Sequence, residues 1–488
     1  MKTYDIIFIH APIIADLEKN TSVKIRRGAY IFIPMGIFAI ADYLEREGFG
    51  VKIINYPLEK YIDPQWSLSE YLKSIEFKIC AIDLHWIHNS FGAIHIIRKV
   101  KEVYPNAKIV FGGYSASYYH KELLQYYKNI DCVIKGDGEI PLLEYTKAIT
   151  RQSSNLEDIP NISYKNNRDN IRINPIRYVA KDLDQLNFTN VELLKNHRIY
   201  LEESRKIMGI SFNLAVGRGC PFNCPLCGGG QRAQQKISCR KKVILRSPEK
   251  VVQDITKILD NYNTNSVFFG HGTYPANLSY WKRIFKLIRN EKLDVSGDIE
   301  IWRLPLPKEM WREYFKTFNR RHSSISISPR TTSARVQQKI AKICDPTFQF
   351  PISQLQDLIK NATLFRMPLR IWLSLGYPFQ TYGDILRDFK FTMNCLLKNG
   401  TSTIKPITIM SEPYYIFPGS PAFEAPKKFD IDLTHPSLLQ IVDSFKNSSI
   451  SFFYNVINYN SKYFSGHTIQ TINKLLFLFA APMFLTGS

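Results

Sequence analysis

The sequence predicts an α/β protein made of two parallel-sheet units. The first unit is a doubly wound, Rossmann-like sheet, and the second is a partial (β/α)6 TIM-like barrel followed by a small C-terminal helical region. Short apolar strand segments alternate with amphipathic helical segments over the first 150 residues, and a second alternating series begins at Phe212. A chain of 488 residues is also too long for one hydrophobic core of ordinary size.

These observations divide the chain into four segments. We expect the first sheet over residues 1–150, a linker with a hairpin over 151–205, the partial barrel over 206–428 and a helical extension over 429–488.

Strands of the first unit are expected at 4–10, 51–56, 79–84, 108–111 and 132–135, with helices near 34–47, 91–103 and 121–127 and after Pro141. In a doubly wound sheet, ligands bind at the carboxyl ends of the strands. Four short segments stand at those ends: "HAP" at 10–12, "LHWIHNSFG" at 84–92, "GGYSAS" at 112–117 and "GDGE" at 136–139. Together they indicate a large ligand on one edge of the sheet.

The second unit has six expected strands, at 212–217, 266–270, 298–302, 324–328, 370–375 and 407–411. Six strand–helix repeats are two short of a complete barrel, so one side stays open. Between the two units, "NISYKNNRDNIRIN" at 161–174 is typical of a hairpin. Ser247 is expected to cap a helix that begins at Pro248.

Composition narrows the class of protein. The hydrophobic fraction is 45% and the charged fraction 22%, as in globular proteins, and eight cysteines are too few for a disulfide scaffold. We therefore expect a reducing, cytoplasmic location. The net charge of +21 is spread along the chain, which favours a solvated surface; an anionic substrate or a membrane is the second explanation and nucleic acid the third.

The C-terminal apolar run, Leu475 to Leu485, is shorter than the roughly 20 residues of a membrane-spanning helix. A core or interface helix is the expected reading, with contact to lipid or to an apolar substrate as the alternative.

Three cysteines lie close together in "GCPFNCPLCGGG" at 219–230, in the loop after the first barrel strand. A structural zinc site needs four ligands, and Cys239 in the basic segment "SCRKK" is the candidate fourth. A four-iron cluster held by three thiolates instead keeps one iron open for a small molecule. The spacing of Cys220, Cys224 and Cys227 favours this second reading.

The pattern Cys-x3-Cys-x2-Cys after the first strand of a six-fold series resembles the radical S-adenosylmethionine (SAM) superfamily. The first unit resembles the cobalamin-binding domain of one large subclass. The segments that carry the resemblance are "PMG" at 34–36, "LHWIHN" at 84–89, "FGG" at 111–113, "GDGE" at 136–139, "GYPFQT" at 376–381 and "FPGSPAFEAP" at 417–426, beside the cysteine motif.

The resemblance implies three cofactors: a 4Fe-4S cluster, SAM and cobalamin. Cys220, Cys224 and Cys227 would hold the cluster. The residues implied in SAM binding are Leu226, Gly270, His271, Gly272, Glu300, Ser326, Ser328, Arg335 and Gly376. The family often has an acidic residue where this chain has His271, which is a departure from the pattern.

The residues implied in cobalamin binding are His10, Pro12, Met35, His85, Trp86, His88, Gly112, Gly113, Ser115 and Gly136. The family's Asp-x-His-x-x-Gly motif, which supplies a histidine to cobalt, is absent. We therefore expect cobalamin with its own base displaced and no histidine on cobalt, with His88 as the alternative ligand.

The activity that the resemblance implies is C-methylation of an unactivated carbon by way of a 5'-deoxyadenosyl radical. Cyclisation or rearrangement without methyl transfer is the alternative within this enzyme class, and a zinc- or cluster-stabilised binding protein is the alternative outside it. The expected partners are a small-molecule or lipid-like substrate and an external electron donor of the flavodoxin or ferredoxin type. No nucleic acid is expected, and peripheral membrane contact is a minor alternative.

Overall fold

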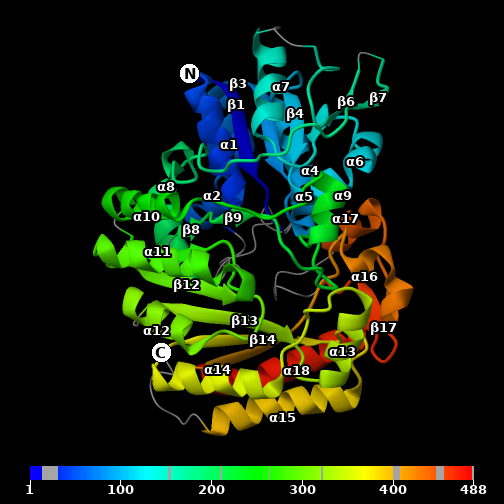
Figure 1. The fold of residues 1–488 in the computed structure, drawn as a ribbon. Coiled ribbons are helices and arrows are strands. Elements are labelled where there is room, and N and C mark those ends of the chain that lie inside the picture. Colours follow the sequence, from blue (N-terminus) through cyan, green and yellow to red (C-terminus); the bar gives the residue numbers. More distant parts are fainter. Residues whose placement is uncertain are drawn as a thin grey trace.

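The computed structural model describes residues 1–13, 31–151, 155–166, 168–208, 212–262, 264–319, 322–398, 407–446 and 456–485. Two sheets dominate the fold, one above the other in Figure 1, and the C-terminal segments run along their side and base.

The first sheet has seven strands in the order β2-β1-β3-β4-β5-β6-β7. They are β1 (Lys2–His10), β2 (Val51–Asn55), β3 (Ile75–Asp83), β4 (Lys108–Gly112), β5 (Cys132–Ile134), β6 (Ile162–Lys165) and β7 (Ile171–Ile173). The first five are parallel in the doubly wound order 2-1-3-4-5, so the direction of winding reverses between β1 and β3. The carboxyl ends of these two strands border the crevice where such sheets bind ligands.

The hairpin β6–β7 pairs antiparallel with β5 and extends this sheet. This part of the segment predicted as a linker therefore belongs to the first sheet by hydrogen bonding. The sequence signal was the turn cluster alone, which gives no information about which strand the hairpin joins.

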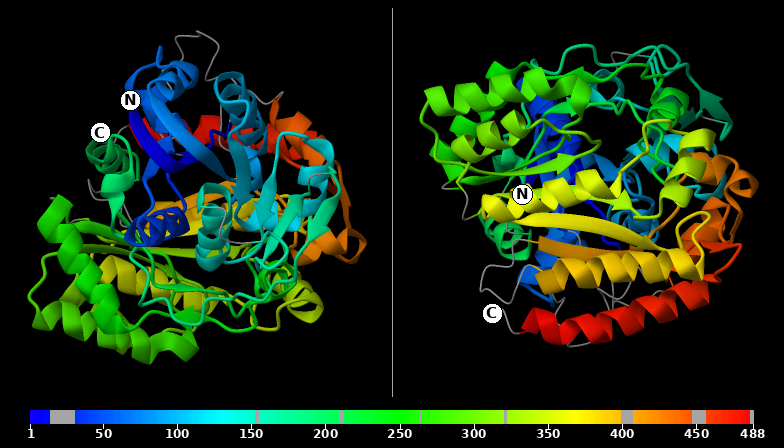
Figure 2. Two further views of the ribbon diagram at one scale, coloured as in Figure 1. Left: turned by 90° about the horizontal axis from the view of Figure 1, so that it is seen from above. Right: turned by 60° about the horizontal axis from the view of Figure 1, so that its bottom comes forward.

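Helices cover both faces of the first sheet (Figure 2). They are α1 (Met35–Arg46), α2 (Tyr56–Ile62), α3 (Leu68–Lys73), α4 (Ser90–Val103), α5 (Tyr114–Tyr118), α6 (His120–Tyr126) and α7 (Glu139–Arg151). On one face, α1 and α7 pack in an apolar core that continues into the barrel, and on the other face α3 and α4 belong to a separate core. The sheet is thus buried on both faces, as its near-continuous apolar strands require.

The second sheet has six parallel strands in chain order, as the sequence predicts for a partial barrel. They are β8 (Phe212–Leu214), β11 (Ser266–Phe269), β12 (Ser296–Ile301), β13 (Ser324–Arg330), β14 (Leu369–Leu375) and β15 (Ile407–Pro413). The helices are α8 (His197–Met208), α9 (Gln231–Ser238), α10 (Pro248–Tyr262), α11 (Leu278–Asn290), α12 (Lys308–Thr317), α13 (Ala334–Ile343), α14 (Ile352–Leu364) and α15 (Tyr382–Lys398). The hydroxyl of Ser247 accepts a 3.2 Å hydrogen bond from the Lys250 amide, so the predicted cap of α10 is present.

The C-terminal region contains α16 (Pro421–Glu424), α17 (Leu438–Lys446) and α18 (Gly466–Leu485). It also contains the short antiparallel pair β16 (Ile431–Leu433) and β17 (Tyr459–Ser461), which the prediction of a helical extension did not include. Helix α18 runs along the base of the barrel beside α15 (Figure 2). Within the described ranges, none of the helices combines the length and the apolar character needed to cross a bilayer.

Candidate functional site

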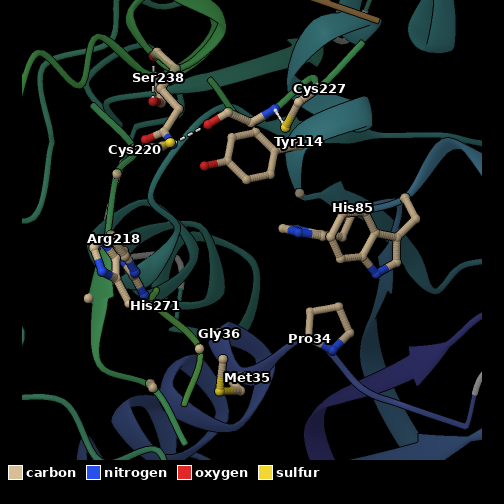
Figure 3. A pocket seen from close by; sticks show the side chains of 18 of the residues that line it. Pro34, Met35, Gly36, His85, Tyr114, Arg218, Cys220, Cys227, Ser238 and His271 are labelled. Carbon is tan, nitrogen blue, oxygen red and sulfur yellow. Dashed lines mark hydrogen bonds between the residues drawn. The ribbon is translucent and has the colours of Figure 1, made fainter. Parts of the chain in front are cut away.

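A cavity of about 830 Å³ lies between the two sheets, at the carboxyl edge of each. Its wall contains predicted site residues from both units (Figure 3). From the first unit they are Met35, His85, Trp86, Gly112, Gly113 and Gly136, and from the barrel they are Cys220, Cys224, Leu226, Cys227, Gly270, His271, Glu300, Ser326 and Ser328. Residues predicted for three separate cofactors therefore share one chamber.

The cysteine loop is fixed mainly by backbone contacts. It leaves the short strand β9 (Gly217–Arg218), which pairs with β10 (Ile244–Leu245), and turns at Gly219 with φ of 104°. The Phe417 amide donates to the Leu226 carbonyl at 3.1 Å, and the Ala422 amide donates to the Pro225 carbonyl at 2.9 Å. The segment "FPGSPAFEAP" thus clamps the cysteine loop from outside.

The three thiols face the chamber in a low-dielectric wall. Burial raises the pKa of the Cys220 thiol, and it raises the pKa of the Cys227 thiol to about 11. Thiols of this kind stay protonated until a metal displaces the proton. The Gly229 amide donates to the Cys227 sulfur at 3.4 Å and would stabilise the negative charge of this sulfur once a metal is bound.

These residues fit a 4Fe-4S cluster better than a zinc ion. Among the described residues, no group of three or more His, Cys, Asp or Glu side chains is arranged around one metal ion. A four-iron cluster makes a different demand, because each thiolate binds a different iron. Cys239 is exposed at the end of α9 and does not contribute to the chamber wall.

His271 is the most distinctive of the predicted SAM-binding residues. Its side chain is buried in the chamber wall, and neither ring nitrogen has a hydrogen-bond partner of acceptable geometry within the described structure. Burial lowers its pKa to about 4, so the ring is neutral at pH 7 and offers one donor and one acceptor. Its ring centroid lies 4.3 Å from that of Trp302, whose indole nitrogen donates to Glu300 at 3.0 Å.

Three predicted SAM-binding residues lie outside the chamber wall: Gly272, Arg335 and Gly376. A Cβ at Gly272 would lie 2.3 Å from the Trp302 ring, so this glycine admits the indole. Arg335 is paired with Asp384 and donates to the Phe379 carbonyl at 2.7 Å. Gly376 has φ of 69°, and a Cβ there would lie 2.3 Å from Ile469 of α18. All three are occupied by contacts within the protein.

The end of β4 supplies two glycines with different surroundings. A Cβ at Gly112 would have no heavy atom within 4 Å, which leaves open space on the chamber side. Gly113 has φ of 104°, and a Cβ there would lie 2.7 Å from the backbone of His85. The second glycine is therefore required by the packing of the neighbouring loop. Ser115, which does not reach the chamber, donates to the His85 carbonyl at 3.1 Å and holds the same loop.

Three other residues predicted for cobalamin also lie outside the chamber wall: His10, Pro12 and His88. His10 Nδ1 lies 3.0 Å from the carboxylate of Asp83, across the reversal point between β1 and β3. The Pro12 carbonyl lies where Gly92 has no side chain, since a Cβ there would be 2.0 Å away. His88 packs against three rings, with centroid distances of 4.9 Å to Tyr415, 5.3 Å to Phe417 and 5.3 Å to Phe445. The histidine of this loop that faces the chamber is His85.

Sequence reasoning missed the charged residues that join the two units. Arg218 donates to Asp137 at 3.1 Å and to Glu139 at 2.5 Å, and Arg240 pairs with the other oxygen of Asp137. The two carboxylates come from "GDGE", of which the sequence predicts only Gly136 as a site residue. Arg240 belongs to the basic segment "SCRKK", and the structure buries it to 4% exposure.

Several large side chains of the wall were also missed. They are Tyr114, Phe222, Trp302, Arg303, Arg330, Phe348, Tyr377 and Tyr414. Most of these residues end or directly follow a strand of the barrel, and no short sequence motif identifies them.

Comparison with known proteins agrees with this arrangement. The B12 binding domain family matches residues 22–146. An uncharacterised methyltransferase of Pyrococcus horikoshii is 23% identical over 364 residues, which cover 73% of this chain and 72% of the relative.

Two solved structures share the fold at low sequence identity. The radical SAM methyltransferase TsrM from Kitasatospora setae, with cobalamin and a 4Fe-4S cluster bound, superposes with a TM-score of 0.64 at 14% identity, over 89% of this chain and 77% of its own. The cobalamin-dependent SAM radical enzyme OxsB, with aqua-cobalamin and SAM bound, gives a TM-score of 0.65 at 13% identity, over 99% of this chain and 67% of its own.

The first unit is a doubly wound B12-type domain that faces a six-stranded open barrel, and three cysteines follow the first barrel strand. This combination is typical of a class of cofactor-dependent enzymes. Residues 22–146 match the B12 binding domain family, and the chain as a whole shares the fold of the cobalamin-dependent radical SAM enzymes TsrM and OxsB.

Proposed function

We propose that the protein is a cobalamin-dependent radical SAM C-methyltransferase that acts on an unactivated carbon. The observation that carries the proposal is the shared chamber, in which the cysteine loop faces the carboxyl edge of the B12-type sheet. A substrate radical has to meet a methyl donor before it is quenched, so both sites must open onto one enclosed space. The relative from Pyrococcus and TsrM are both methyltransferases by name, which supports this reading.

Each cofactor has a set of residues that fits it. Cys220, Cys224 and Cys227 would hold a 4Fe-4S cluster, and Leu226 would lie near the adenine of SAM. His271, Gly270, Glu300, Ser326 and Ser328 are the remaining wall residues assigned to SAM. Together the bound groups supply a 5'-deoxyadenosyl radical and a transferable methyl group, while the protein positions them and excludes water.

Cobalamin would lie against the edge formed by Gly112, Gly136 and the loop of His85 and Trp86. We assign no histidine to cobalt. The packing of His88 supports this assignment, because its ring contacts Tyr415 and Phe417 and does not line the chamber.

We propose a role for each of the four segments. Residues 1–150 form the cobalamin-binding domain, and the hairpin β6–β7 of the segment 151–205 extends its sheet, while the rest of that segment is the linker. Residues 206–428 form the radical SAM barrel and 429–488 the C-terminal extension. The pairs of Arg218 and Arg240 with "GDGE" support a fixed orientation of the first domain on the third.

The electron donor is proposed to be a small acidic protein of the flavodoxin or ferredoxin type, in the cytoplasm. Exposed cations follow the cysteine loop closely: Arg232 and Lys236 on α9, then Lys241 and Lys242. Charge reversal at Lys241 and Lys242 should slow reduction of the cluster by such a donor but leave reduction by dithionite unchanged. If reduction by dithionite also became slower, the two lysines would not be acting through the donor. Reversal at Lys282 and Lys286 on α11, which lies on the other side of Figure 1 from α9, is the matched control.

The substrate is proposed to be a small or lipid-like molecule. The protein, loaded with its three cofactors, is incubated with methyl-labelled SAM, the reductant and a cell-extract fraction of small molecules and lipids. We expect 5'-deoxyadenosine and S-adenosylhomocysteine in roughly equal amounts, with label on carbon in the product. Formation of 5'-deoxyadenosine without label transfer and without S-adenosylhomocysteine would instead indicate cyclisation or rearrangement.

A further inference from the structure

We propose that the ion pair of Arg303 and Asp345 sets the reduction potential of the cluster from the side of Cys224. The inference rests on the proposed function, because it requires a cluster on the three cysteines. Arg303 acts as a positioning residue and has no part in the bonds that are made or broken.

Arg303 is held rigidly at the end of β12. It is 5% exposed, and its Nε donates to Thr347 Oγ1 at 3.0 Å while Nη1 donates to the Trp302 carbonyl at 2.6 Å. The guanidinium carbon also lies 4.0 Å from the centroid of the Phe222 ring, and Phe222 is part of the cysteine loop. A planar cation fixed on an aromatic face keeps its orientation when the charge nearby changes.

The remaining nitrogen of Arg303 reaches the sulfur of a predicted cluster ligand. Its Nη2 lies 3.5 Å from Cys224 Sγ and 2.5 Å from Asp345 Oδ2. A positive charge at this distance, in a wall from which water is largely excluded, stabilises extra negative charge on the cluster. Arg303 is therefore expected to favour the reduced cluster.

Asp345 has the opposite electrostatic effect and a separate structural one. Its Oδ2 also accepts a 3.1 Å hydrogen bond from the Asn223 amide, inside the cysteine loop. Its Oδ1 accepts from the Thr347 amide at 3.0 Å, so both oxygens are fixed. The carboxylate thus holds the loop and at the same time partly cancels the charge of Arg303.

This arrangement gives an electrostatic role a signature that a structural role lacks. Removal of the positive charge should make the reduction potential more negative, and removal of the negative charge should make it less negative. A merely structural ion pair would respond in the same way to loss of either partner, because the same contact is broken.

The test uses the full-length protein with its cluster reconstituted anaerobically, in the absence of substrate. The variants are Arg303→Gln, Asp345→Asn and the double variant, and the readouts are iron content and the potential from a redox titration followed by electron paramagnetic resonance. The matched control is Arg289→Gln, because Arg289 pairs with Glu313 at 2.6 Å on the outer helices of the same barrel.

We expect shifts of opposite sign in the two single variants, a double variant near the wild type, and no shift in the control. The inference would be overturned if the two single variants shifted the potential in the same direction or not at all. It would also be overturned if both single variants lost the cluster while the control retained it. If Arg303→Gln alone loses the cluster, an unchanged or lowered potential in Asp345→Asn still overturns it. A wild-type protein that binds no cluster would contradict the proposed function itself, which distinguishes the two failures.

Discussion

Replacing Gly112 with phenylalanine should weaken cobalamin binding while the protein stays folded. Gly112 ends β4 and faces the chamber, and a Cβ there would meet no heavy atom within 4 Å. The residue has no positive φ, so a side chain is compatible with the backbone. Gaining a side chain in a strand contributes about 0.5–1 kcal/mol to stability, which roughly offsets the exposure of an apolar ring.

The ring would occupy space that cobalamin needs against the sheet. Forcing extra bulk into a filled site costs about 1–3 kcal/mol, which corresponds to about a 5- to 150-fold loss of affinity. Cobalamin affinity is measured anaerobically by absorbance titration, together with iron content and thermal unfolding. The expected result is weakened cobalamin binding with unchanged iron content and an unfolding temperature close to that of the wild type.

Gly113 provides the contrast that makes this prediction specific. Its φ of 104° disfavours any side chain, and a Cβ would lie 2.7 Å from the His85 backbone. Such strain costs about 1–3 kcal/mol before the close contact is counted, so a bulky residue at Gly113 should destabilise the first domain itself. Wild-type cobalamin affinity in a well-folded Gly112→Phe protein would refute the placement of cobalamin on this edge.

Three further predictions test other parts of the site. Alanine at any of the three loop cysteines should abolish the iron content of reconstituted protein, whereas Cys239→Ala should retain it. A tightly bound zinc that is lost in Cys239→Ala would show that the loop is a zinc site. His271→Ala should weaken SAM binding to the cluster-loaded protein by about tenfold, because one buried hydrogen bond contributes about 1–1.5 kcal/mol. The control is His322→Ala at an exposed site, and equal SAM affinities of the two variants would show that His271 does not bind SAM. Burial, together with Lys135 and Lys121, lowers the pKa of His120 to about 4. Between pH 6.5 and 4 the folded state therefore binds fewer protons than the unfolded state, so stability should fall as the pH falls through this range. Urea unfolding at pH 7, 6 and 5 measures how the free energy of unfolding changes with pH. The same pH dependence in His120→Gln would show that His120 is not its source.

Local sequence patterns determined the two sheets. The strands predicted for both units agree with the observed ones to within about four residues at each end, because alternation of buried apolar runs with amphipathic helices is a local property of the chain. The cysteine spacing is equally local, since three thiols within eight residues must lie in one loop wherever that loop is placed.

Tertiary structure alone decided which neighbouring side chains face the chamber. His85 and His88 are three residues apart, and the turn at Ile87–Asn89 directs them to different surroundings. The choice depends on Phe417 and Tyr415, which lie more than 300 residues later in the chain and pack against His88. A short motif contains no information about such a distant partner.

The same limit applies to the charged residues. Asp137 and Glu139 meet Arg218 and Arg240 only when the two units dock, and Arg303 reaches Cys224 because Asp345 fixes both the guanidinium and the cysteine loop. A buried ion pair between distant segments exists because each charge must find a partner when water is removed. The sequence by itself determined most strands of the two sheets and placed the three cysteines in one loop, and only the docking of the two sheets decided which charges surround that loop.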